Sequence, residues 1–249
     1  MPDAVRYGIF EGLPLTQALS TRKGGVSPEP YHSLNMGLRT GDAVANVEKN
    51  RLLFFEHLKL NIKKTAFQSQ VHSDHIRRVS QPGLIPRCDA MITDVPGLTL
   101  TVQAADCAPV FIYDPRNHAC GVVHSGWRGT AQNIAGKTIA AMGRAFGSRP
   151  SELRVAIGAA IQARNYQVDE KTAAHFEAGF LLPDVPGHFK LDVSGAIHAQ
   201  LIAAGITAQN IERDTTCTYE AADIFYSYRR DGARSGRMMG VLCLENKER

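Results

Sequence analysis

The sequence lacks the features that mark several common classes of protein. Its 249 residues contain no apolar run near the ~18 residues that cross a bilayer, and they begin without the basic and apolar segments of a signal peptide. There is no block of basic residues typical of nucleic-acid binding, and the net charge is only +4. We therefore expect a cytoplasmic protein whose partners include neither a membrane nor a nucleic acid.

Two further absences concern cysteine and the nucleotide-binding loops. The five cysteines are an odd number and form no CxxC pair, a pattern typical of reduced thiols rather than of a disulfide framework. No GxxxxGK[ST] segment is present, which gives little support to a nucleoside triphosphate as ligand.

What is present indicates one globular domain, which we predict to span residues 1–249. The chain is 44% apolar and 21% charged, and it has no repeat, low-complexity tract or linker. Short β-rich runs lie at 98–102, 109–113, 119–123 and 153–157, and helices are predicted over 44–60, 134–146, 170–180 and 194–204. Since these elements show no regular βαβ alternation, we predict an α+β fold with mixed sheets flanked by helices.

Three side chains adjoin predicted strands and are candidate metal ligands. They are His72 in Gln70-Val71-His72, Cys107 in Ala105-Asp106-Cys107, and His124 at the start of His-Ser-Gly-Trp-Arg-Gly. A catalytic zinc ion takes three nitrogen, oxygen or sulfur ligands and keeps a fourth position open. The spacing is non-local, however, and each residue taken alone could equally be a satisfied polar group or a small core residue.

Two arginines are candidate anion ligands. Arg128 lies in the segment after His124, where glycines permit close backbone approach and a following helix would offer its N-terminus to an anion. Arg22 lies in a Thr-Arg-Lys-Gly-Gly loop, and a guanidinium offers phosphate a planar, bidentate fork. The alternatives are a surface ion pair for Arg128 and a solvated turn for Arg22, while Trp127 could face a purine or fill the core.

Several short motifs occur in an order that resembles the YfiH family, whose members have been labelled polyphenol oxidases or laccases. The resemblance extends from about residue 20 to 242. The motifs are Thr21-Arg22-Lys23-Gly24-Gly25-Val26-Ser27, Leu34-Asn35, Asn50-Arg51, Gln70-Val71-His72, Ala105-Asp106-Cys107-Ala108-Pro109, His124-Ser125-Gly126-Trp127-Arg128-Gly129, Cys217-Thr218, Tyr228-Arg229-Arg230 and Gly236-Arg237.

This resemblance implies a single YfiH-like domain with zinc held by His72, Cys107 and His124. It also implies phosphorolysis of adenosine, inosine, guanosine and methylthioadenosine by inorganic phosphate, together with adenosine deamination. We expect a monomer in which Arg22, Arg128 and Gln70 bind substrate or phosphate. The catalytic set is then His72, Cys107, His124, Asp106 and Arg22.

The chain departs from the family pattern at two places. It has Gly158-Ala159-Ala160-Ile161 where the family usually has Gly-Pro-x-Ile, and Gln167 where the family usually has glutamate. A glutamine cannot shuttle a proton, so any acid or base must be another group. Asp106 and Asp89 are the candidates.

Three other functions remain open from the sequence. Two histidines and a cysteine could bind copper in a polyphenol oxidase, although the chain contains no H-x-H pair for a trinuclear copper cluster. Cys107 could instead be the nucleophile of a cysteine hydrolase with His124 as its base, which chelators would activate. A nucleotide-binding protein without turnover is the third alternative.

Overall fold

The apolar runs near the middle of the chain form strands that are buried on both faces. In the computed structural model, which describes residues 1–246, β8 (Ala108–Asp114) pairs antiparallel with β9 (Ala119–Ser125), and every residue of both strands is buried. Because side chains alternate along a strand, Phe111 and Tyr113 enter one apolar core while Val110 and Ile112 enter another. These strands therefore lie inside a layered structure.

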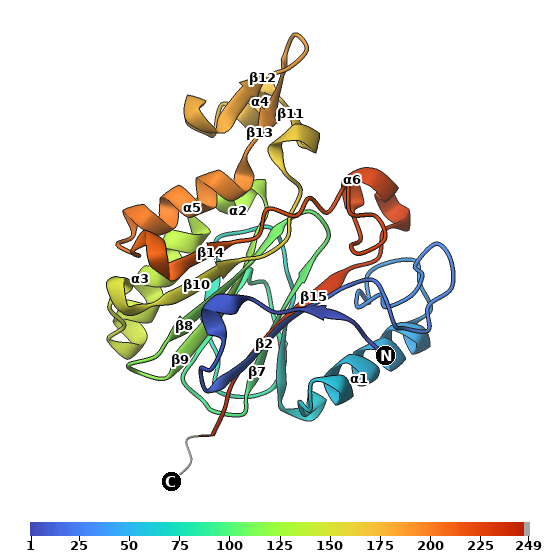
Figure 1. The fold of residues 1–249 in the computed structure, drawn as a ribbon, viewed down its shortest axis with the longest axis vertical. Helices are drawn as coiled ribbons and strands as arrows, with labels where there is room; N and C mark the ends of the chain where they lie inside the picture. The colour runs from blue at the N-terminus through green and yellow to red at the C-terminus, as the bar shows by residue number, and fades with distance from the viewer. Residues whose placement is uncertain (247–249) are drawn as a thin grey trace.

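Two six-stranded sheets and a three-stranded sheet account for the described strands (Figure 1). The first sheet has the order β1 (Ala4–Val5), β2 (Leu15–Ser20), β15 (Met238–Leu244), β7 (Thr99–Ala104), β3 (Thr65–Gln68) and β5 (Gly83–Ile85). The second has the order β14 (Ile211–Arg213), β10 (Arg154–Ile157), β8, β9, β6 (Ala90–Thr93) and β4 (Ile76–Arg78). The third has the order β11 (Gln167–Asp169), β13 (His188–Leu191) and β12 (Leu181–Pro183).

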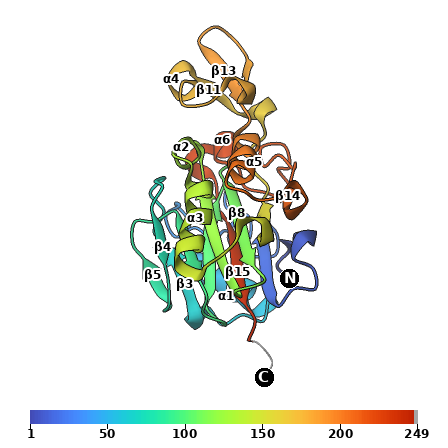
Figure 2. The same cartoon turned by 90° about the vertical axis from the view of Figure 1, so that its left-hand side faces the viewer.

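The two large sheets pack face to face, and helices cover their outer faces (Figure 2). The core between the sheets joins Leu100 of the first sheet to Phe111 of the second. Helix α1 (Val44–His57) covers the first sheet with Phe54 and Phe55. Helices α2 (Trp127–Ala131), α3 (Ile134–Phe146) and α5 (Val193–Ala203) cover the second. This arrangement confirms the predicted α+β class, with mixed sheets flanked by helices.

Three of the four predicted helices are confirmed, but the helix predicted over 170–180 is wrong beyond its first turn. Helix α4 runs only over Glu170–Ala173, where Asp169 caps it by accepting a hydrogen bond from the backbone of Thr172. The chain then turns, and β12 pairs antiparallel with β13 in the small third sheet (Figure 1). Residues 174–180 instead form a turn and the 3-10 helix Ala178–Phe180, which contains Gly179, a poor helix former, and ends where β12 begins.

The remaining helix, α6 (Tyr228–Asp231), precedes β15. No helix within residues 1–246 is both long enough and apolar enough to cross a bilayer. The domain boundary predicted at residue 249 lies outside the described residues.

Candidate metal centre

The chain passes from the first large sheet to the second three times in succession at one end of the sandwich. These crossovers are residues 69–75 between β3 and β4, 86–89 between β5 and β6, and 105–107 between β7 and β8. They lie at the same end because β3 is parallel to both β5 and β7. The first carries His72, the second Asp89 and the third Cys107, and β9 brings His124 in beside them.

The three predicted ligands converge. One ligand atom from each of His72, Cys107 and His124 lies within 4.8 Å of the others, and the two imidazole rings meet edge to face with centroids 4.9 Å apart. Ligands around a tetrahedral zinc ion are bonded at about 2.0–2.3 Å, so they are separated by somewhat less than this limit. The donor set, two nitrogens and one sulfur, also matches what zinc takes in catalytic sites. The prediction that these groups meet is confirmed, and the residues fit a metal ion.

Gly126 leaves room for the ligand thiol. A β-carbon at this position would lie 2.7 Å from Cys107 Sγ and 3.6 Å from His72 Cδ2, and the first distance is shorter than a van der Waals contact. The glycine in the His-Ser-Gly-Trp-Arg-Gly segment is therefore required by the packing of the metal ligands.

Asp89 orients two of the three ligands from one buried carboxylate. Its Oδ1 accepts hydrogen bonds from the ring Nδ1 of His124 at 2.9 Å and from the backbone N–H of His72 at 3.0 Å. Its Oδ2 accepts from the backbone N–H groups of Val71 and Ser73 and from the hydroxyl of Ser73. These bonds hold His72 at a positive φ of 58°, a conformation that a non-glycine residue rarely adopts. With Nδ1 bound to Asp89, the Nε2 of His124 is free for a metal.

The ligands polarise one another. Burial raises the pKa of the Cys107 thiol, but the charges and hydrogen bonds of His124 and His72 outweigh burial and lower it to about 6. Burial lowers the pKa of His124, but Cys107 and Asp89 outweigh burial and raise it to about 9. Burial also raises the pKa of Asp89, yet its bonds to His124 and Ser73 bring that pKa below its usual range. At neutral pH the thiol is therefore ionised, which is the form that binds a metal.

Asp106 holds the turn that presents Cys107. Its φ is 85°, and its Oδ1 and Oδ2 accept hydrogen bonds from the Thr218 hydroxyl at 2.7 Å and the Arg229 backbone N–H at 2.6 Å. Asp106 lines the site, as predicted, but both of its oxygens already have protein partners. Its contacts thus favour a positioning role, as do those of Asp89, over the proton transfer expected from the sequence.

The other predicted residues differ in position. Gln70 lines the pocket, but its amide oxygen and nitrogen bind the backbone N–H and carbonyl of Gln103. Arg22 lies outside the pocket, where its Nε and Nη1 donate to the carbonyls of His32 and Ala222. Its position does not support the expected phosphate role.

The segment after His124 also differs from expectation. The helix begins within it, at Trp127, and spans only five residues, while the next helix has its N-terminus capped by the side chain of Asn133. Arg128 is exposed and stacks on Trp127 at 4.4 Å, and neither residue lines the pocket. Trp127 packs against the core under the second sheet, as expected if it fills the core rather than facing a purine.

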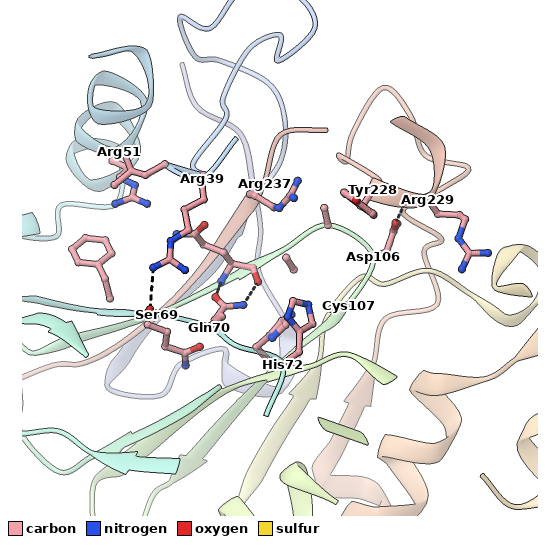
Figure 3. A pocket seen from close by; sticks show the side chains of 18 of the residues that line it. Arg39, Arg51, Ser69, Gln70, His72, Asp106, Cys107, Tyr228, Arg229 and Arg237 are labelled. Carbon is pink, nitrogen blue, oxygen red and sulfur yellow. Dashed lines mark hydrogen bonds between the residues drawn. The ribbon is translucent and has the colours of Figure 1, made fainter. Parts of the chain in front are cut away.

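A pocket of about 640 Å³ opens beside the trio (Figure 3). Four arginines line it, Arg39, Arg51, Arg229 and Arg237, and sequence reasoning assigned a role to none of them. Arg51, Arg229 and Arg237 occur in motifs that carried the family resemblance, and this was the one sign in the sequence that they belong to the site. Aromatic and apolar side chains complete the wall, among them Phe67, Tyr166, Tyr228, Leu38 and Leu84.

Two imidazoles and a thiolate at the edge of an arginine-lined pocket define a candidate metal-dependent site for anionic or phosphorylated ligands. The chain belongs to the family described as "Multi-copper polyphenol oxidoreductase laccase", whose model matches residues 16–245. This membership confirms the resemblance to the YfiH proteins.

Relatives and solved structures agree with this placement. A protein of Corynebacterium glutamicum named a purine nucleoside phosphorylase is 34% identical over 93% of this chain and 95% of its own length. One of the same name from Deinococcus radiodurans is 35% identical over 95% of this chain and 92% of its own. The crystal structure of YlmD from Geobacillus stearothermophilus matches with a TM-score of 0.92 and 31% identity over 96% of this chain and 94% of that one. That of Bacillus licheniformis YfiH matches with a TM-score of 0.91 and 32% identity over 94% of each chain.

Proposed function

We propose that this protein is a zinc-dependent purine nucleoside phosphorylase. Its substrates are purine nucleosides, namely adenosine, inosine, guanosine and methylthioadenosine, and inorganic phosphate. The observation that carries the proposal is that one pocket joins a His-Cys-His trio to four guanidinium groups. The two relatives align with nearly the whole chain, and their names support the same reaction.

The pocket suits a purine nucleoside in size and lining. Its volume lies within the roughly 300–1,000 Å³ typical of small-molecule sites. Tyr166 and Tyr228 offer aromatic surfaces for a base, and each has an arginine stacked on it, Arg229 at 5.2 Å and Arg237 at 5.5 Å. Burial, with the charge of Cys107, raises the pKa of Tyr166, which therefore stays a neutral hydrogen-bond donor at neutral pH.

Arg237 is the best-placed group to hold the attacking phosphate. Its guanidinium lines the same pocket as the trio. Burial lowers its pKa, and the charges of Cys107, Tyr228 and Asp106 partly offset this effect. In phosphorolysis a phosphate oxygen bonds to C1′ as the bond from C1′ to the purine nitrogen breaks. Fixed positive groups around the phosphate stabilise the charge that moves in this step. A zinc ion held by the trio would supply Lewis acidity at the same place.

Adenosine deamination is the second activity that we propose for this pocket, because the trio leaves a metal position open for water. Gln167 cannot carry the proton, since its amide donates to Asp184 and it does not line the pocket. Asp106 is the pocket's only carboxylate among the described residues, and its two hydrogen bonds assign it to positioning Cys107 rather than to carrying the proton.

The copper oxidase has less support than the phosphorylase. Among residues 1–246, no methionine lines the pocket to serve as an axial copper ligand. Within residues 1–246 the trio is also the one group of three or more side chains suited to a metal, so a trinuclear cluster has no ligands there. The ionised pair of Cys107 and His124 does favour a cysteine hydrolase, and chelation separates this alternative from ours.

Product analysis of metal-quantified protein tests the proposal. With inosine we expect hypoxanthine and ribose 1-phosphate, formed only when phosphate is present and lost on chelation. Cys107→Ala should abolish turnover, while Cys243→Ala, which removes a buried thiol from β15, should not. Release of free ribose without phosphate, or activation by a chelator, would contradict the proposed reaction.

A further inference from the structure

The pocket holds more positive charge than the proposed reaction uses. It has four arginines and, among the described residues, one carboxylate, that of Asp106. None of the four arginines has a carboxylate within 4.0 Å in residues 1–246. Phosphorolysis needs one phosphate beside C1′, and Arg237, which lines the same pocket as the trio, is the group proposed to hold it. The positive charge of the other three arginines would be balanced by a second anion.

Arg51 is a buried cation that makes no ion pair with a carboxylate within residues 1–246. It projects from α1, and only 8% of its surface is exposed. Its Nε and Nη2 donate to the carbonyl of Met36 at 3.0 and 2.7 Å, and its guanidinium lies 5.0 Å from the centre of the Phe67 ring. Its Nη1 makes no hydrogen bond within residues 1–246. Because burying an unpaired charge is unfavourable, a group in this state favours an anionic ligand.

Arg39 completes a pair at the same end of the pocket. It lies on the exposed rim, where its Nη2 donates to the Ser69 hydroxyl at 3.1 Å. Burial lowers the pKa of Arg51 to about 10, and the charge of Glu48 partly offsets this effect. Figure 3 shows Arg39 and Arg51 on the side of the view away from His72 and Cys107. The pair therefore lies apart from the expected position of the attacking phosphate.

We propose that Arg39 and Arg51 form a second anion subsite, which binds a phosphoryl group carried by the nucleoside itself. The pocket then accepts purine nucleoside monophosphates as well as nucleosides. Two guanidinium groups suit this ligand, because each offers several N–H donors to phosphoryl oxygens. The purine part of this inference rests on the proposed function, whereas the phosphoryl subsite rests on the two arginines alone.

Binding of AMP, adenosine and orthophosphate to the metal-quantified protein, measured by calorimetry at constant ionic strength, tests the subsite. We expect AMP to bind at least about tenfold more tightly than adenosine, since hydrogen bonds to charged groups are worth about 1.5–3 kcal/mol. Arg51→Gln should remove this advantage, so that the variant binds AMP no more tightly than adenosine, and Arg39→Gln should reduce it less because its side chain is exposed. Arg144→Gln, an exposed arginine of α3, controls for net charge.

Each outcome decides the matter. Equal affinities for AMP and adenosine overturn the subsite, as does a loss of orthophosphate binding in Arg51→Gln with AMP binding retained. If circular dichroism shows that Arg51→Gln does not fold, the exposed Arg39→Gln variant gives the answer. If AMP binding depends on the pair but no nucleoside is cleaved with phosphate, the subsite stands and the proposed function fails.

Discussion

Replacing Asp89 by asparagine should disable the metal site without changing any ligand. The carboxylate accepts five hydrogen bonds, from three backbone N–H groups, the Ser73 hydroxyl and the ring Nδ1 of His124. An asparagine of the same shape has only one oxygen, so its NH₂ group must face donors on one side. His124 can relieve this clash by moving its proton to Nε2, the nitrogen that would bind the metal.

The expected losses follow from this change. A carboxylate that hydrogen-bonds to a metal-binding histidine contributes about 10–100-fold to metal affinity, and we expect a loss in that range. Removing one partner of a buried charged pair costs about 3–5 kcal/mol, so the free energy of unfolding should fall by a similar amount. Because the fold lowers the pKa of Asp89 below 3.8, its contribution is present above that pH and is lost as the pH falls through the folded pKa.

The assay is competition for zinc with a chromophoric chelator, combined with urea unfolding of the same samples. Asp94→Asn is a matched control, because Asp94 directly follows β6 as Asp89 directly precedes it, and its ion pair with Arg78 is exposed. Our reasoning is refuted if Asp89→Asn binds zinc within about threefold of Asp94→Asn.

Three further predictions concern the same site. In metal-free protein at pH 7 the Cys107 pKa of about 6 leaves about nine-tenths of that thiol ionised. Iodoacetamide should therefore label it with an inflection near pH 6, and zinc should protect it, as peptide mass spectrometry will show. Gly126→Ala should push Cys107 aside and cut zinc content, while Gly179→Ala, which has open space around it, should not. Arg22→Gln should change kcat/KM for nucleosides less than about threefold, since Arg22 lies outside the pocket; a larger loss would restore its predicted role.

Local patterns in the sequence were sufficient where structure depends on neighbouring residues. The apolar stripe over residues 134–146 gave the bounds of α3, and the runs at 109–113 and 119–123 became the central strands β8 and β9. Residues 174–180 differ from the prediction, since they form a turn and a 3-10 helix that lead into β12. The position of β12 depends on its pairing with β13, a contact that no local pattern contains.

The metal trio could be predicted because zinc ligands are a small set of residue types set in distinctive motifs. The arginines that line the pocket could not, because arginine is common on surfaces and its role depends on where its guanidinium lies. Arg22 and Arg51 show the difference. The first lies in a conspicuous glycine loop but outside the pocket, and the second, in the middle of a helix, lines the pocket.

By itself the sequence determined which residues could ligate a metal, which segments would be buried, and the family to which the chain belongs. Only the tertiary structure decided that the three sheet-to-sheet crossovers meet at one end, since that depends on β3, β5 and β7 running parallel. The roles of Asp89 and of the four pocket arginines also depend on the tertiary structure. Hydrogen bonds and charges act over a few ångströms in space, whatever the separation along the chain.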